Sequence, residues 1–255
     1  RTPQASASHY LSYSVNRLGI FGGSFNPVHM GHCAVAEHFV RQVGLDTCMF
    51  VPTYISPFKK DEPGVAEPYH RLSMLRSVCL TNARFAVSDV ELRRRDVSYT
   101  VTTVRHFRDR YPKAELFLLI GQDLVPRFDE WRDWEEIVRM ATVCVARRSP
   151  DVVPGVGDIH GFSDAARADA AMLQRMSATG HAPLELFPPR IDVSSSMVRT
   201  MCSRGESVRY IVPETVRRLI RRHGLYKGSA SGVGKGHGKD TGTIPDGADT
   251  AGRQT

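Results

Sequence analysis

The run from Gly19 to His32 constrains the fold more than any other stretch of this chain. A short apolar segment, Leu18–Phe21, ends in the paired glycines Gly22–Gly23, and a helical pattern follows the run. A strand, a tight glycine turn and a helix N-terminus in that order form a site for phosphate, because the first N–H groups of a helix point at anions. The same run carries two imidazoles, His29 and His32, which indicates chemistry beyond phosphate binding.

Apolar runs alternate with helical patterns along most of the chain. Runs such as Leu116–Ile120 are continuous, which is typical of a strand covered on both faces. The alternation predicts an α/β fold with a doubly wound, mainly parallel sheet. The expected strands are Leu18–Phe21, Cys48–Val51, Arg84–Val87, Glu115–Ile120, Thr142–Ala146 and Leu184–Phe187.

Helices are expected between the strands, and the first should end at Gly44, a natural residue for the left-handed position after a helix. The segment Ser163–Ser177 is predicted to be an exposed helix, and the last two helices form a small C-terminal helical part. The other expected helices are Tyr69–Asn82, Thr100–Arg110, Trp134–Met140, Ser196–Ser203 and Pro213–His223.

The 255 residues divide into three predicted parts. Residues 1–16 form a flexible N-terminal extension, and residues 17–227 form one large domain with a substantial core. Residues 228–255 are rich in Gly, Ser and Thr, and we expect a disordered tail. No stretch reaches the roughly 20 apolar residues that span a bilayer.

The net charge indicates which partners suit the chain, and the cysteines indicate its redox compartment. A net charge of +7 suits a polyanion such as a nucleotide, a polyphosphate or nucleic acid, although the same balance also serves solubility alone. No nucleic-acid motif is present, so no nucleic-acid partner is expected. Five scattered cysteines without a Cys-x-x-Cys pair predict free thiols in a reducing, cytoplasmic location, with an organellar or nuclear one still open.

Parallel doubly wound sheets bind ligands beyond the carboxyl ends of their strands, where the strand order reverses. In the commonest order this point lies between the first and fourth strands. The fourth predicted strand is followed by Gly121-Gln122-Asp123, and the first by the Gly22–His32 run. Both flanks of the crevice are thus polar and contain glycine, which favours a nucleotide site.

The run lacks the Gly-x-Gly-x-x-Gly pattern of dinucleotide-binding dehydrogenases and the lysine of a P-loop. His29 and His32 could bind a metal at i, i+3, but no third ligand is evident nearby. A purely structural role is the other alternative for the pair.

The segment Gly22–His32 resembles the signature of the nucleotidyltransferase superfamily that carries an H-x-G-H motif. Within it, the chain is similar to bacterial-type nicotinate/nicotinamide mononucleotide adenylyltransferases over residues 17–227. Further segments follow in family order: Val51–Tyr54, Ser56–Lys59, Ser98–Val101, Ile120–Asp123, Trp131–Glu135, Val193–Arg199, Tyr210–Pro213 and Gly224–Tyr226.

The resemblance implies a Rossmann-like nucleotidyltransferase fold that moves the adenylyl group of ATP to a pyridine mononucleotide. His29, His32 and Arg199 would then be catalytic. The expected ATP-binding residues are Gly22, Gly23, Ser24, Phe25, Gly31, Gly121, Asp123, Ser194, Ser195 and Ser196; the expected mononucleotide-binding residues are Lys59, Thr100 and Trp131. Mg²⁺ would arrive with ATP, so no metal site of the protein is expected.

Plain alternatives stand beside several of these roles. Ser194 or Ser195 could only cap a helix, and Asp123 could be a turn residue. Trp131 could be a core residue, and Lys59 a solvated charge. Three positions depart from the family pattern: Phe58 replaces His, Asn26 replaces Asp and Ser196 replaces Thr.

The rival functions are a pantetheine-phosphate adenylyltransferase and a nucleotide-binding sensor that has lost activity. Pantetheine-phosphate enzymes resemble the chain in their Ser-Ser motif but are much shorter and lack the Trp131 region. The intact His29, His32 and Arg199 argue against a decayed enzyme. The sequence leaves the oligomeric state open, with a homo-oligomer as one possibility.

Overall fold

A computed structural model describes residues 15–55, 57, 64–147 and 164–227. Within these residues, six parallel strands form one sheet in the order β3-β2-β1-β4-β5-β6. The predicted doubly wound parallel sheet is confirmed. The strands are β1 (Arg17–Gly23), β2 (Thr47–Pro52), β3 (Phe85–Val87), β4 (Glu115–Gly121), β5 (Thr142–Ala146) and β6 (Leu184–Leu186).

The switch of strand order lies where the sequence predicts it. β1 pairs with β2 on one side and with β4 on the other, so the turn after β1 lies beside the turn after β4. Continuous burial along Leu116–Ile120 matches a strand covered on both faces. The carboxyl ends of β1 and β4 therefore open into the same crevice.

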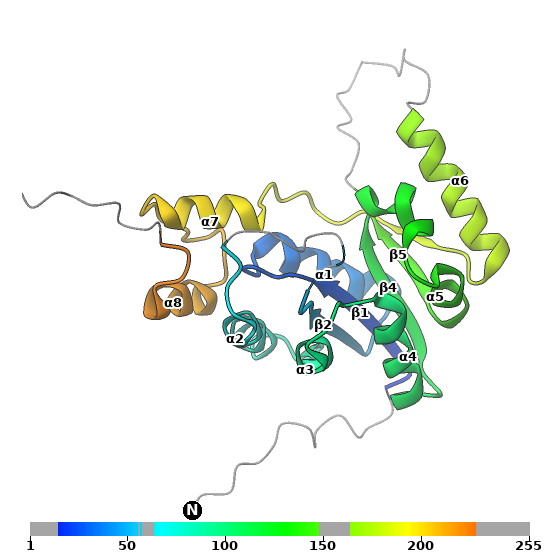
Figure 1. The fold of residues 1–255 in the computed structure, drawn as a ribbon, viewed down its shortest axis with the longest axis horizontal. Coiled ribbons are helices and arrows are strands. Elements are labelled where there is room, and N and C mark those ends of the chain that lie inside the picture. Colours follow the sequence, from blue (N-terminus) through cyan, green and yellow to red (C-terminus); the bar gives the residue numbers. More distant parts are fainter. Residues whose placement is uncertain (1–14, 56, 58–63, 148–163, 228–255) are drawn as a thin grey trace, which may run out of the picture.

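Helices cover both faces of the sheet (Figure 1). One face packs against α1, α2, α7 and α8, and the other against the α3–α6 part of the chain. The helices are α1 (Met30–Val43), α2 (Pro68–Cys79), α3 (Val90–Arg94), α4 (Thr100–Arg110), the 3-10 segment η2 (Gln122–Glu130), α5 (Trp134–Met140), α6 (Asp164–Thr179), α7 (Ser195–Ser203) and α8 (Glu214–His223).

The first helix shows how the sequence sets an element that carries the site. Its buried residues Ala36, Phe39, Val40 and Val43 recur at helical spacing and form one apolar stripe. Gly44 ends α1 in the left-handed conformation, with φ of 68°, and its N–H bonds to the Val40 carbonyl. The predicted end of this helix is confirmed, and the helix N-terminus faces the crevice.

The prediction that residues 163–177 form an exposed helix is wrong in one respect. Met172 and Met176 of α6 are buried, with 2% and 0% of their surface exposed, and they join the core on the α5 side. The segment is rich in Ala, Asp and Arg, so two methionines four residues apart do not produce a recognisable apolar face in the sequence. Sequence analysis also missed α3 and η2, since α3 has five residues and η2 contains Pro126.

The small C-terminal helical part is confirmed as α7 and α8. Figure 1 shows them gathered with α2 at one end of the molecule, with α5 and α6 at the other. Ser77 of α2 and Thr215 of α8 are joined by a hydroxyl hydrogen bond of 3.1 Å. Residues 1–14, most of the predicted extension, and the predicted tail at 228–255 lie outside the described residues.

Across the described part of the chain, no helix combines the length and the apolar character that a membrane crossing requires.

The burial of α6 gives a direct test of its place in the core. Replacing Met176 by Ala should lower the free energy of unfolding by about 2–4 kcal/mol, because the change leaves a cavity in the α5–α6 packing. Replacing the exposed neighbour Ser177 by Ala should change it by less than about 0.5 kcal/mol. Urea denaturation measures both, and equal small effects would show that α6 does not belong to the core.

Candidate active site

A cavity of about 680 Å³ opens at the carboxyl ends of β1 and β4. It brings together segments that lie more than 160 residues apart in the chain, from the loop after β1 to the start of α7. Ten of the predicted site residues line it: Ser24, His29, Gly31, His32, Gly121, Asp123, Ser194, Ser195, Ser196 and Arg199.

The His29 and His32 rings lie against each other at the start of α1, with an angle of 30° between their planes. Their ring centroids are 3.7 Å apart. The His29 backbone N–H donates to His32 Nδ1 at 3.3 Å, which leaves the proton of a neutral His32 on Nε2. The buried Phe25 ring lies 5.0 Å from the His32 ring and supports it from behind. Phe25 holds φ of 45°, a conformation that bulky residues seldom adopt.

Burial keeps both imidazoles neutral at neutral pH. It lowers the pKa of His29 from 6.5 to about 4. The pKa of His32 is lowered well below its ordinary value, first by burial and then by the neighbouring His29. A neutral imidazole can donate one hydrogen bond to a phosphate without adding a buried charge to the crevice.

Two glycines lie close to side chains that line the cavity. A Cβ at Gly31 would lie 3.1 Å from the His29 ring, so the ring would have to shift by a few tenths of an ångström. A Cβ at Gly121 would lie 2.7 Å from Asp123 Oδ1. Both substitutions would displace a side chain that lines the cavity.

The N-terminus of α7 forms the opposite wall. Ser194 caps this helix by accepting the Met197 N–H at 3.1 Å, so the capping alternative holds for this residue. The Ser195 hydroxyl instead donates to the Pro27 carbonyl at 2.9 Å and ties α7 to the histidine loop. The first turn of α7 carries partial positive charge toward the cavity.

Arg199 lies one turn into α7 and joins the two walls. Its guanidinium donates to the Asn26 carbonyl at 2.9 Å and to the Ser196 hydroxyl at 3.2 Å. A guanidinium held in this way presents a fixed fork of donors, which suits phosphate oxygens.

Asn26, a departure from the family pattern in the sequence, is the centre of the loop after β1. Its side chain is fully buried, accepts the Ala66 N–H at 2.9 Å and donates to the Gly64 carbonyl at 3.4 Å. An aspartate could accept the first bond but could not donate the second. The Asn26–Pro27 peptide bond is cis.

A second buried residue, Arg71 of α2, was missed. It is 1% exposed and donates to the Ser24 carbonyl at 2.8 Å and to the Ala66 carbonyl at 3.1 Å. Burial lowers the pKa of Arg71. The burial of Arg71 could not be predicted from the sequence, because an arginine in an amphipathic helix is normally expected on the solvent-exposed face.

The far rim of the cavity was also missed. The segment Pro188–Val193 lines it together with Arg147 at the end of β5. Arg147 forms ion pairs with Asp169 and Glu185, so its charge is balanced within the protein. Arg190 pairs with Asp192 at 2.9 Å. This irregular segment has no periodicity from which its position could be predicted.

The remaining predicted residues lie elsewhere. Gly22, Gly23 and Phe25 do not line the cavity, although they belong to the loop that shapes it. Thr100 starts α4, and Trp131 packs against Phe128 with ring centroids 4.8 Å apart. Neither lines the cavity. Lys59 and Phe58 lie outside the described residues.

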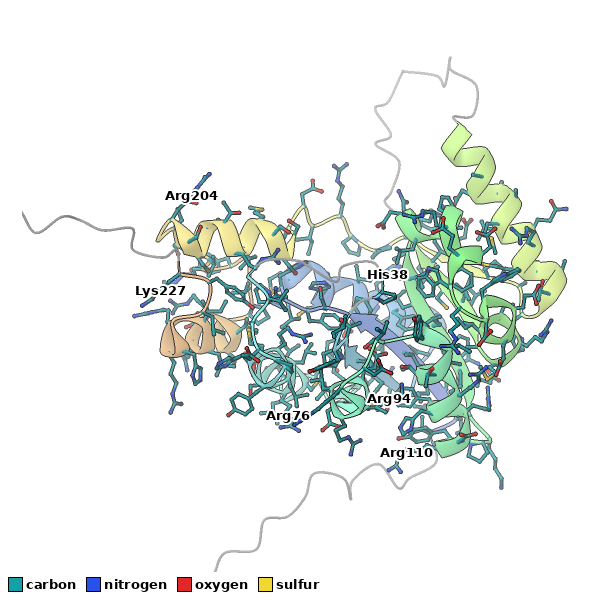
Figure 2. All side chains as sticks on the ribbon, viewed as in Figure 1. His38, Arg76, Arg94, Arg110, Arg204 and Lys227 are labelled. Carbon is teal, nitrogen blue, oxygen red and sulfur yellow. The ribbon has the colours of Figure 1, made fainter. Side chains whose placement is uncertain are left out.

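Arg204 and Lys227 lie near the α7–α8 end of the molecule, whereas Arg94 of α3 and Arg110 of α4 lie at the lower edge of the view (Figure 2). Among the described residues, no group of three or more His, Cys, Asp or Glu side chains is placed to hold a metal ion.

Comparison with known proteins identifies relatives over most of the chain. The profile of the family described as Cytidylyltransferase-like matches residues 20–201. A Rhodopirellula baltica protein named "Probable nicotinate-nucleotide adenylyltransferase" is 34% identical over 222 residues, which cover 87% of this chain and 99% of the relative. A Neisseria meningitidis protein of the same name is 33% identical, with 84% and 100% covered.

Solved structures show the same fold. The nicotinic acid mononucleotide adenylyltransferase of Plasmodium falciparum, in complex with NaAD, aligns with a TM-score of 0.61 at 15% identity. The alignment covers 83% of this chain and 97% of that one.

The neutral histidines predict how stability depends on pH. The unfolded chain protonates His29 near pH 6.5, but the folded protein does so only near pH 4. The unfolded state therefore binds more protons between these values, and stability falls as the pH falls through this window. The loss from His29 should reach about 2 kcal/mol at pH 5.

Denaturation in urea between pH 7.5 and 4.5 measures this loss. His29→Gln should reduce the slope of stability against pH, although His32 still contributes to it. His181→Gln, at an exposed position, is the control for the substitution itself. An unaltered slope in His29→Gln would show that His29 is not held neutral by the fold.

Proposed function

The chain belongs to the cytidylyltransferase-like family and, within it, to the nicotinate-nucleotide adenylyltransferases; on that premise we propose that it transfers the adenylyl group of ATP to nicotinate (or nicotinamide) mononucleotide. The products are deamido-NAD (or NAD) and pyrophosphate, and the reaction belongs to NAD biosynthesis. The observation that carries the proposal is the single cavity that joins the His29–His32 pair to the first turn of α7 and Arg199.

The reaction is an in-line displacement at phosphorus. A phosphate oxygen of the mononucleotide attacks the α-phosphorus of ATP, the bond to the oxygen that bridges the α- and β-phosphorus atoms breaks, and pyrophosphate leaves with its electrons. No protein nucleophile is needed. Catalysis then depends on positioning the two substrates and on stabilising the charge that develops on the phosphate oxygens.

The histidine pair is assigned to the α-phosphate. The Nε2–H of His32 is oriented by the bond that Nδ1 accepts from the His29 N–H, so one donor is held ready. The His29 ring lies against this ring, and burial lowers the pKa of His29 to about 4. Bound triphosphate raises the pKa of both imidazoles, since nearby negative charge favours their protonated forms.

Arg199 and the start of α7 are assigned to the β- and γ-phosphates. The Ser195 and Ser196 N–H groups belong to the first helical turn, whose N–H groups have no partner within the helix. Together with the Arg199 fork they offer several donors to the leaving pyrophosphate. Gly121 and Asp123 are assigned to the ATP nucleoside, with the Asp123 carboxylate accepting from a ribose hydroxyl.

Lys59, Thr100 and Trp131 remain assigned to the mononucleotide by resemblance to the family. Mg²⁺ is proposed to enter as part of the MgATP substrate, where it neutralises charge on the triphosphate. We infer a cytoplasmic location from the five free cysteines, which suit a reducing compartment. No nucleic-acid partner is proposed.

A single assay separates this function from its rivals. The purified protein is given MgATP with nicotinate mononucleotide, nicotinamide mononucleotide or phosphopantetheine, and pyrophosphate release is measured. We expect release with a pyridine mononucleotide and none with phosphopantetheine.

Release only with phosphopantetheine would assign the rival adenylyltransferase. If ATP binds but no acceptor supports release, the chain is a nucleotide-binding sensor instead. The ratio of kcat/KM for the two pyridine mononucleotides gives the preference between acid and amide.

A further inference from the structure

The C-terminal end of the described chain reaches back to the catalytic loop. Tyr226 lies three residues after α8, and its hydroxyl donates to Asn26 Oδ1 at 2.8 Å. The two residues are 200 positions apart in the sequence. Tyr226 is half-buried, and its ring packs against the core on the α1–α2 side of the sheet.

Asn26 connects this hydroxyl to the cavity. Its Oδ1 accepts two hydrogen bonds, one from Tyr226 and one from the Ala66 N–H. Its backbone carbonyl accepts the Arg199 guanidinium. The side chain is fully buried, so water cannot replace a bond that is lost. The bonds to Oδ1 and the bond to the carbonyl are made by the same residue, so holding the side chain also restricts the carbonyl that Arg199 contacts.

We propose that Tyr226 is a positioning residue: its hydroxyl holds Asn26 so that the Asn26 carbonyl orients Arg199 toward the triphosphate. The inference rests on the proposed function for the identity of the ligand. It makes docking of the Gly224–Tyr226 segment a condition for assembling the ATP site. Tyr226 itself does not line the cavity, so it acts only through Asn26 and Arg199.

The surroundings of the hydroxyl agree with this role. Burial raises the pKa of Tyr226, and the nearby Arg199 and Arg71 guanidinium groups act in the opposite direction. The phenol stays protonated at neutral pH and can donate its hydrogen bond. Arg71 holds the other side of the same loop through the Ser24 carbonyl. The loop is thus fixed from α2, from α7 and from the C-terminal segment.

The hydroxyl and the ring can be separated experimentally. Tyr226→Phe keeps the ring in the core and removes only the donor. Tyr69→Phe is the matched control, because Tyr69 lies on α2 with 66% of its surface exposed and lines no part of the cavity. Both variants are compared with the wild type in calorimetric titrations with a non-hydrolysable ATP analogue.

We expect Tyr226→Phe to weaken binding of the analogue about five- to tenfold, as the loss of one buried hydrogen bond does. The KM for the mononucleotide should change by less than about twofold, and Tyr69→Phe should bind as the wild type does. When Arg199 is already replaced by Lys, Tyr226→Phe should change the free energy of analogue binding by less than about half as much as it does in the wild type. The reason is that both substitutions disturb the same chain of contacts from Tyr226 through Asn26 to Arg199.

Unchanged affinity for the analogue in Tyr226→Phe would overturn the proposal. So would an effect of full size in the Arg199→Lys background, since Tyr226 would then act by another route. Titrations are made at a temperature where circular dichroism shows each variant fully folded. Because the readout is binding, a wild type that binds the analogue but releases no pyrophosphate would refute the proposed function and leave this inference standing.

Discussion

The hydrogen bond between the Arg199 guanidinium and the Asn26 carbonyl is the contact on which the site depends. It joins segments that lie 173 residues apart in the sequence, the loop after β1 and the first turns of α7. The Ser195 hydroxyl adds a second tie at the Pro27 carbonyl. Neither segment alone surrounds a triphosphate. Brought together at the switch point of the sheet, two helix N-termini and one guanidinium face a single cavity, and under the proposed function they supply the donors for the three phosphates of ATP.

Desolvation sets the second constraint. The His29 and His32 rings lie against each other beside Phe25, and desolvation lowers the pKa of both imidazoles so that they stay neutral at neutral pH. Burying a neutral hydrogen-bond donor costs less free energy than burying a cation. The hydrogen bond from such a donor to an anion is also stronger in a medium of low dielectric constant. The buried positive charge of Arg71 is instead directed to backbone carbonyls beneath the loop. The groups that shape the loop are thus different from the groups that we propose to bind the phosphate.

Local patterns were enough to predict the frame of the molecule. Continuous apolar runs gave the strands, and Gly44 marked the end of α1, so the switch point and its flanking segments followed from topology. The same patterns could not predict contacts made across long separations. The bonds of Asn26 to Ala66, Tyr226 and Arg199 depend on tertiary packing, and a buried arginine such as Arg71 looks like any surface cation in a helix. The buried face of α6 was not predicted either, because two methionines among alanines and charged residues give only a weak helical periodicity of apolar side chains.

The most direct test of the central claim separates binding from chemistry at His32. The claim is that this residue donates to the α-phosphate as it is attacked, and does little to hold ATP beforehand. In single turnovers at saturating MgATP and nicotinate mononucleotide, His32→Ala should release pyrophosphate roughly a thousandfold more slowly, while its affinity for a non-hydrolysable ATP analogue changes only a few-fold. The exposed His181→Ala serves as the control. A His32→Ala enzyme that is folded and turns over at close to the wild-type rate would contradict the claim.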